Sequence, residues 1–275
     1  MKITASEVNK LRQQTGAGMM DCKKALEEAQ GNFEAAVDIL RKKGQKVAAK
    51  RGDREASEGV IIAKSTTDGK KSVMIGLNCE TDFVAKNEAF VSVAQHILDV
   101  AVNEAPASLD ALKAASYPGS SVTISEKITE EIGKIGEKIE LSTFEVVEGE
   151  STVAYNHPGN SLASIVSFNK TAGEDVTKDV AMQVAAMAPV AVNEDSIPED
   201  VIAKELEIGK DQAIQEGKPA EMADKIAQGR LKKFFKESTL LNQMFIKDNK
   251  VSIAKYLQDK EDGLTVTAFK RASLS

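Results

Sequence analysis

Tryptophan is absent from this chain of 275 residues, and aromatic residues make up only 4% of it. Proteins that hold single-stranded nucleic acid by base stacking need exposed aromatic rings, so the composition argues against that class. The formal net charge of -6 points the same way, because dedicated nucleic-acid binders are usually basic. We therefore expect no nucleic-acid partner.

Cysteine and long apolar runs are also scarce. The two cysteines, Cys22 and Cys79, lie far apart and do not form a disulfide framework, which favours a reducing compartment. No run approaches the roughly 18 apolar residues of a membrane span, and the polar start of the chain lacks the apolar stretch of a secretion signal. We expect a cytoplasmic protein without a membrane partner.

Metal ligands and phosphate-binding loops are not evident either. The soft ligands are Cys22, Cys79, His96 and His157, and none has C-x-x-C or H-x-x-x-H spacing. A structural zinc site usually has about four ligands in paired spacing, so we expect no metal. The glycines flanking Ala17 match neither the phosphate loop nor the Rossmann pattern. We expect no cofactor and no direct binding of nucleotide.

What the chain does contain begins with helix signals. Thr4 and Glu7 have the spacing of a capping box and predict a first helix. Residues 19–30 are good helix formers. Asn32 can cap a third helix, which we expect to stop at Gly44. Together these signals predict a small three-helix module.

Residues 41–54 are basic and contain two glycines. We interpret them as a solvated helix end and a linker, which places the module boundary at residue 53. The alternative is a patch that contacts phosphates, and a nucleic-acid-binding module is one alternative function of the chain.

Strand and helix signals then alternate. Asp68-Gly69 is a turn signal between two β-rich runs, which predicts a hairpin. A similar order of strand, turn, strand and helix recurs further along, and residues 73–78 can be laid over residues 164–169. The predicted strands are 58–64, 72–77, 141–147, 152–155 and 162–168, and the predicted helices are 87–102, part of 122–139, and 176–187. Thr123 and Glu126 have the spacing of a capping box at the start of the second of these helices.

These repeated signals predict an α+β fold with two related subdomains, each built on an antiparallel sheet. We place the first subdomain at residues 54–148 and the second at residues 149–275. Residues 196–238 form an insertion within the second one, with helical patterning that predicts an antiparallel helical hairpin.

The hairpin carries its own signals. Ser196 and Glu199 have capping-box spacing at its start. The small residues Gly209 and Gly229 would permit close approach of helices. A protruding hairpin with small residues on one face can also pair with a copy of itself, so a homodimer through the hairpin is possible.

Phe83 lies where a strand gives way to a helix. It is either a staple that packs against the following helix, or an exposed apolar wedge beside the carboxylate of Asp82. Met19 and Met20 are adjacent, so on a helix they point about 100° apart. One of them can pack inside the bundle while the other faces out, where a methionine is an adaptable contact. From the residues alone we favour the core.

Cys79, His96 and Asp82 supply the residue types of nucleophilic catalysis, so a cysteine hydrolase is a second alternative function. The competing interpretation makes Cys79 a small apolar filler at a strand end. We favour the filler and assign no catalytic residue.

Two segments resemble the bacterial elongation factor Ts family: TGAGMMDCKKAL at residues 15–26 and NCETDFV at residues 78–84. The resemblance implies a guanine nucleotide exchange factor, not an enzyme. Such a factor binds the GTPase elongation factor Tu, in its GDP-bound and nucleotide-free forms, and releases GDP during translation elongation.

The resemblance also implies contact residues. Thr81, Asp82, Phe83 and Val84 would push into the GTPase near its Mg²⁺ site, and Met19 and Met20 would contact its GTPase domain. The turn at His157 would lie near its distal domain. The family core has two such halves with a protruding hairpin. Longer members continue with a further helical module, whose contacts are not transferred to this chain.

Overall fold

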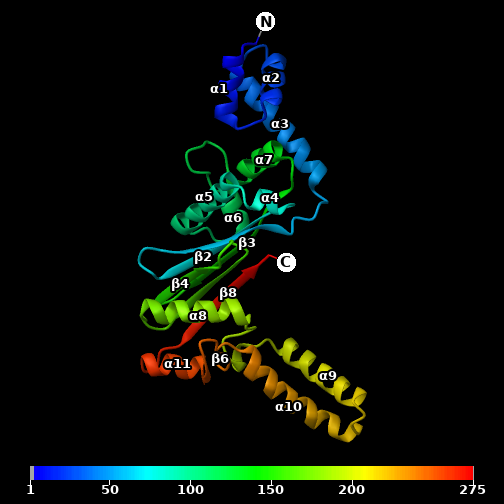
Figure 1. The fold of residues 1–275 in the computed structure, drawn as a ribbon, viewed down its shortest axis with the longest axis vertical. Helices are drawn as coiled ribbons and strands as arrows, with labels where there is room; N and C mark the ends of the chain where they lie inside the picture. Colours follow the sequence, from blue (N-terminus) through cyan, green and yellow to red (C-terminus); the bar gives the residue numbers. More distant parts are fainter. Residues whose placement is uncertain (1–2, 275) are drawn as a thin grey trace.

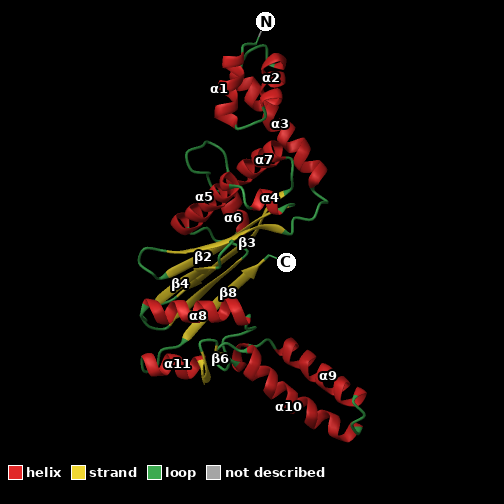
Figure 2. Ribbon diagram, in the orientation of Figure 1, coloured by secondary structure: helices red, strands yellow, loops and turns green. Residues whose placement is uncertain are grey.

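The structure is a computed structural model that describes residues 3–274. Its centre consists of two three-stranded antiparallel sheets with helices on their outer sides (Figures 1 and 2). The N-terminal helices lie at one end of the elongated molecule, and a helical hairpin projects near the other. The expected α+β class with antiparallel sheets is confirmed.

The N-terminal module contains α1 (Ala5–Thr15), α2 (Met19–Glu28) and α3 (Phe33–Arg51). The predicted caps are present, since Thr4 forms a capping box with Glu7 and Asn32 accepts a hydrogen bond at the start of α3. Buried Leu11, Cys22 and Leu26 fill the centre of the small bundle.

Helix α3 does not stop at Gly44, so that prediction was wrong. It continues to Arg51 because Gly44 packs on Gly133 of α7 (Ile124–Ile135). A Cβ atom added to Gly44 would lie 2.9 Å from the Thr129 carbonyl oxygen, and one added to Gly133 would lie 2.6 Å from the Gly44 Cα. Glycine permits the two helices to cross closely here, and this packing outweighs the low helix propensity of glycine.

The first sheet has the order β1-β2-β3 and is covered on one face by helices. Its helical layer includes two short helices, α4 and α6, which the sequence patterns did not predict. The α7 capping box between Thr123 and Glu126 was predicted and is present. The elements are β1 (Glu58–Ser65), β2 (Lys71–Cys79), α4 (Asp82–Ala85), α5 (Glu88–Glu104), α6 (Leu109–Ala114), α7 and β3 (Ile139–Glu148).

The second sheet has the order β4-β5-β8 and packs against helices on its own outer face. Phe168, Val180 and Leu257 are among the side chains buried there. A two-stranded sheet, β6-β7, lies beside this layer. The elements are β4 (Ser151–Asn156), β5 (Leu162–Phe168), α8 (Glu174–Met187), β6 (Met244–Phe245), β7 (Asp248–Ser252), α11 (Ile253–Lys260) and β8 (Val266–Ser273).

The two sheets also pack on one another through a separate, small cluster. Its buried members include Ile61, Ala63 and Met74 from the first sheet and Ala163 and Ile165 from the second. Strands β1, β2 and β5 are therefore buried on both faces, which explains their nearly continuous apolar sequences.

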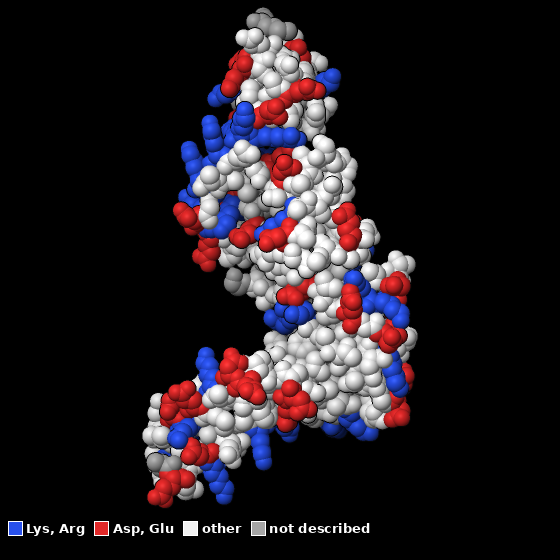
Figure 3. Space-filling view, turned by 180° about the vertical axis from the view of Figure 1, so that it is seen from behind, with Lys and Arg blue, Asp and Glu red and all other residues white. Residues whose placement is uncertain are grey.

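The hairpin follows a short 3₁₀ turn, η1 (Glu194–Ser196), and consists of α9 (Glu199–Gln215) and α10 (Ala220–Ser238). The predicted capping box was wrong: Ser196 bonds back to Asn193 and ends η1, while Pro198 precedes α9. Figure 3 shows a hollow between the projecting hairpin and the core.

The two hairpin glycines differ. Gly209 lies against α10, where an added Cβ would be 3.3 Å from the Ala227 Cα, so the predicted close approach is confirmed there. No described atom lies within 4 Å of a Cβ built at Gly229, so its assignment to the contact was wrong.

None of the helices in residues 3–274 is both long enough and apolar enough to cross a membrane.

Candidate functional site

The connection between β2 and α4 is held rigidly by hydrogen bonds. Strand β2 ends at Cys79, and Thr81 caps α4 by accepting a bond from the Val84 N–H. The Thr81 backbone N–H and Oγ1–H both donate to the carboxylate of Glu137, at 3.1 and 2.7 Å. Glu137 lies beyond the C-cap of α7, and no short motif in the sequence links it to Thr81. The Thr81–Val84 segment is thus fixed to the edge of the first sheet.

Phe83 projects from this connection into solvent with 83% of its surface exposed. It is therefore not a staple, and that interpretation is wrong. Its neighbour Val84 takes the inward role and packs against the core of the first subdomain. Since an exposed phenylalanine gains nothing from burial in the free protein, the structure leaves the wedge arrangement as the alternative.

Asp82 lies beside this exposed ring and remains a carboxylate. Its Oδ2 accepts a hydrogen bond from Lys86 Nζ at 2.7 Å, and that bond holds the pKa of Asp82 below its usual range. The same pair raises the pKa of Lys86. The junction therefore presents an apolar ring next to a negative charge at neutral pH.

Both N-terminal methionines are exposed, Met19 by 54% and Met20 by 62%. The prediction that one of them packs inside the bundle was wrong. The buried face of α2 begins one turn later, at Cys22, and is completed by Ala25 and Leu26. The first turn of α2 thus offers two flexible apolar side chains at the surface.

His157 lies on the turn between β4 and β5 and is exposed. Its backbone N–H donates to the Leu162 carbonyl at 2.9 Å, and its Nδ1 lies 3.1 Å from the Tyr155 hydroxyl. Gly159 and Asn160 both have positive φ, which closes the turn. The predicted turn is confirmed, and it presents the imidazole outward.

Cys79 is buried and un-ionised, as a filler would be. Burial, and then the negative charge of Glu137, raise its pKa to about 12. Its Sγ–H donates to the Thr81 carbonyl at 3.2 Å, while His96 Nδ1 is occupied by the Tyr117 hydroxyl at 2.8 Å. A thiol that stays protonated and has no access to solvent is not a nucleophile, so the structure argues against a cysteine hydrolase.

The basic segment 41–54 is mostly the second half of α3 and not a linker. Three of its cations pair with carboxylates on neighbouring elements, as Arg41–Glu130, Lys43–Asp21 and Arg51–Glu80. Figure 3 shows Lys and Arg gathered where the N-terminal module meets the core, with acidic residues among them. These three ion pairs neutralise part of the positive charge of the segment and tie it to the neighbouring elements.

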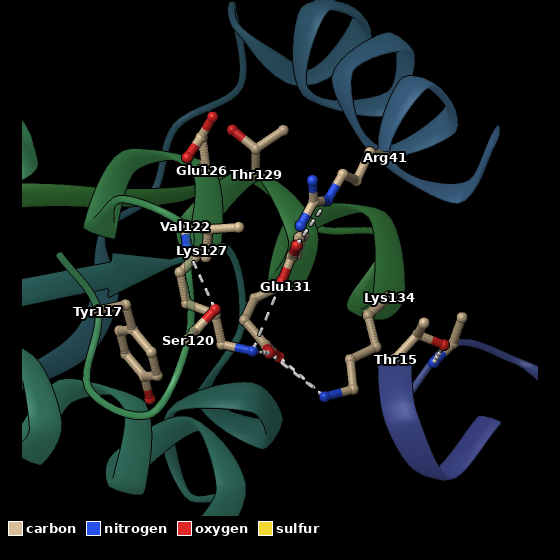
Figure 4. Close-up of polar contacts among 12 residues, drawn as sticks. Thr15, Arg41, Tyr117, Ser120, Val122, Glu126, Lys127, Thr129, Glu131 and Lys134 are labelled. Atoms are coloured by element: carbon tan, nitrogen blue, oxygen red, sulfur yellow. Dashed lines mark hydrogen bonds and ion pairs between the residues drawn. The ribbon is translucent and has the colours of Figure 1, made fainter. Parts of the chain in front are cut away.

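A cavity of about 510 Å³ opens at the junction between the module and the core. Beside it lies Glu131, only 5% exposed, which accepts from Lys127 at 2.9 Å and Lys134 at 3.3 Å (Figure 4). Burial alone would lower the pKa of Lys127, but its bonds and charge contact with Glu131 outweigh this and raise it. The charged side chains around the cavity, including Arg41 with its partner Glu130, are engaged with one another.

Residues 3–274 contain no cluster of three or more His, Cys, Asp or Glu side chains arranged to hold a metal ion. The functional residues singled out from the sequence do not converge on one pocket. They lie on three separate surfaces: the start of α2, the β2–α4 junction and the β4–β5 turn.

Comparison with known proteins assigns this scaffold to a family. The sequence model of the family described as Elongation factor TS matches residues 80–275. A protein named Elongation factor Ts from Christiangramia forsetii is 50% identical over 275 residues, with 99% of each chain covered. Its namesake from Amoebophilus asiaticus is 51% identical over 274 residues, covering 98% of each chain. The namesake from Porphyromonas gingivalis is 46% identical, covering 100% of this chain and 99% of its own. This chain is therefore a member of the elongation factor Ts family.

Proposed function

We propose that this chain is a guanine nucleotide exchange factor that binds the GTPase elongation factor Tu and promotes GDP release during translation elongation. Family membership supports the general role, and the resemblance of the NCETDFV segment supports the partner. An exchange factor forms no covalent bond with its partner, so the function requires no catalytic residue and no nucleotide site of its own.

The single observation that carries the proposal is the 83% exposure of Phe83 at a rigid strand-to-helix junction. A wedge must be exposed before it binds and must not yield when it is pushed. Thr81 supplies the second property, because its two bonds to Glu137 anchor the junction to the segment that leads into β3.

Exchange requires preferential binding to the opened GTPase. Such a GTPase holds GDP through backbone amides around the phosphates and a bridging Mg²⁺. A factor that binds the opened form better lowers the barrier to release, and by linkage GDP weakens the factor by the same ratio. Asp82 would act beside the wedge, where its carboxylate disturbs the water and charge around the Mg²⁺ ion.

One side chain does not suffice. Tilting an equilibrium from about 1:99 to 99:1 needs roughly 5.5 kcal/mol of differential affinity. Burying a phenylalanine contributes about 1.5–3 kcal/mol. We therefore assign the remaining affinity to Met19 and Met20 on the N-terminal module and to His157 on the β4–β5 turn.

This distribution gives each proposed unit one contact. Residues 1–53 would carry the methionine pair, residues 54–148 the wedge, and residues 149–275 the histidine turn. The unit boundaries and these roles are proposals that truncation and substitution can test.

The test uses elongation factor Tu loaded with fluorescent GDP and chased with unlabelled nucleotide. Adding this protein should accelerate the loss of fluorescence in a concentration-dependent, saturable way. Mixing this protein with fluorescent GDP alone should give no binding signal. A release rate that stays at the value of the GTPase alone, at any concentration of this protein, contradicts the proposal.

A further inference from the structure

Strand β1 lies at the outer edge of the first sheet, and its free side is covered by the other subdomain. In the described chain β1 pairs with β2 alone, so its outward N–H and C=O groups need other partners. The Ala63 N–H donates to Asn156 Oδ1 at 2.7 Å, and Asn156 Nδ2 donates to the Ala63 carbonyl at 2.9 Å. The Asn156 side chain thus satisfies one residue of β1 as a neighbouring strand would.

A third hydrogen bond lies on the same free side of β1. The Ile61 N–H donates to the Asn160 carbonyl at 2.6 Å, at the other end of the turn that carries His157. Two alternate residues of β1 are therefore clamped by the two ends of one turn. These bonds cross between segments about a hundred residues apart in the chain, and they join the two sheets.

Directional bonds matter here because the side chains between the sheets are short. Of the ten residues in this cluster, six buried and four partly buried, five are alanines. Apolar burial is not directional, so such a contact resists separation better than it resists sliding. A side-chain amide with one donor and one acceptor fixes both position and orientation.

The Asn156–Ala63 bonds also connect two of the proposed contact surfaces. Asn156 immediately precedes His157, and Ala63 pairs with Met74 of β2. Strand β2 runs directly into the junction that presents Phe83. The turn and the wedge therefore share one scaffold. The Asn156–Ala63 bonds join the two sheets at the end that carries the turn, while Thr152 joins them near the tip of the β1–β2 hairpin.

We propose that Asn156 is a positioning residue that fixes the His157 turn relative to Phe83, so that both engage the partner GTPase at once. This inference rests on the proposed function above. Two contacts held at the correct spacing bind without the cost of first ordering the scaffold. Without the Asn156–Ala63 bonds, both side chains are still present but no longer engage the partner at the same time.

Asn169 provides a matched control. Its Nδ2 donates to the Gly263 carbonyl at 2.9 Å, and its Oδ1 accepts from the Thr265 N–H at 2.8 Å. It is exposed, as Asn156 is, and makes the same pair of side-chain-to-backbone bonds. Its partners, however, lie within the second subdomain, so their loss does not loosen the joint between subdomains.

The experiment compares Asn156→Ala with Asn169→Ala in the full chain. Both should fold and melt within a few degrees of each other, because each loses an equivalent pair of bonds. At saturating concentration, Asn156→Ala should slow the stimulated release of GDP on the order of tenfold, the effect of about two net hydrogen bonds. Asn169→Ala should stay within about twofold of the unsubstituted protein.

A second pair of variants tests the route through the turn. If Asn156 acts by placing His157, the double variant Asn156→Ala/His157→Ala should release GDP no more slowly than the slower single variant. Effects that multiply in the double variant, or equal losses in the Asn156→Ala and Asn169→Ala proteins, overturn the positioning role.

Hydrogen exchange of the free protein separates this inference from the proposed function. The Ile61 amide reports docking of the turn, since its partner is the Asn160 backbone, which the substitution does not touch. In Asn156→Ala its protection should fall together with that of Ala63. Continued protection of the Ile61 amide would show that the turn stays docked without Asn156. The inference would then fail, whatever rate the GDP-release assay gives. Lack of any stimulated GDP release by the unsubstituted protein would instead remove the proposed function.

Discussion

At the scale of single residues, Phe83→Ala is the most direct test of the wedge. The ring is 83% exposed, so its removal should change the free energy of unfolding by less than about 0.5 kcal/mol. Stimulated GDP release should slow by roughly one to two orders of magnitude, as losing about 1.5–3 kcal/mol of burial in the complex requires. Thermal melting and the fluorescent GDP assay measure the two effects.

Phe90→Ala is the matched control for that change, because Phe90 is only 2% exposed in the helical layer of the first sheet. It should lose about 3–5 kcal/mol of stability. If Phe83→Ala melts like Phe90→Ala, and exchange falls only in proportion to the folded fraction, the wedge role is wrong.

Cys79 makes a prediction about pH. Burial raises its pKa from 9.0 to about 12, so the native state holds the thiol proton more tightly than the unfolded chain does. The associated stability is fully present below about pH 9 and declines, by about 1 kcal/mol per pH unit, as the pH rises towards 12. The stability difference between the unsubstituted protein and Cys79→Ala should therefore shrink between pH 8 and pH 10.5. A difference that is independent of pH would show that the thiol is not desolvated.

At the scale of elements, the crossing of α3 and α7 depends on a pair of glycines. Gly133→Ala would place a Cβ 2.6 Å from the Gly44 Cα, so the helices must separate. We expect a loss of about 1–3 kcal/mol and faster proteolysis within α3. Gly229→Ala is the control, since its added Cβ meets open space in the middle of α10 and should stabilise by about 0.5–1 kcal/mol. Equal melting temperatures for the two variants would show that the crossing of α3 and α7 does not depend on these glycines.

The helical hairpin should be an appendage of the core. Its base is held by backbone bonds, among them Leu240 N–H to Ala191 C=O. Replacing residues 198–233 with a short flexible linker should leave the melting temperature of the two subdomains unchanged. The stimulated rate of GDP release should fall only partly, if at all. Failure of this variant to fold would mean that the hairpin supports the core.

Self-association belongs to the same test. We propose that any homodimer forms through the hairpin, where Ile208, Ile214 and Met222 are exposed. Because Gly209 is already used within the hairpin, these larger side chains are the available apolar surface. Light scattering of the full chain and of the hairpin variant should then show a dimer only for the full chain. A dimer that persists in the hairpin variant would rule out the hairpin as the dimer contact.

At the scale of the whole molecule, the boundary after the N-terminal module can be located by two truncations. Removal of residues 1–40 deletes Met19 and Met20 but keeps the part of α3 that docks on the core. Removal of residues 1–53 also deletes Val47 and Ala48, which pack on the core, and leaves Glu80 without Arg51. Both truncations should weaken binding to elongation factor Tu, and only the longer one should also cost about 1–3 kcal/mol of core stability. Undiminished binding by the shorter variant would show that the module is not a contact surface.

The sequence by itself determined the helix caps and the order of strands and helices, because these depend on residues close together in the chain. The caps at Thr4, Asn32 and Thr123 depend on residues within three positions, and each formed as predicted. Strand and helix periodicity likewise gave the α+β class and the strand-turn-strand-helix order of both halves. Such signals are legible because a capping bond or an apolar stripe is complete within one segment.

Tertiary contacts decided the rest. Gly44 by itself predicts a helix end, and only its contact with Gly133 explains why the helix continues. The residues around Phe83 favour a staple, and only its exposure in the folded protein shows that it is not one. The anchoring of Thr81 by Glu137, and the clamp of Asn156 on Ala63, join residues 56 and 93 positions apart. No local pattern encodes such a pair, because its two members meet only when segments that are distant in the sequence fold against one another.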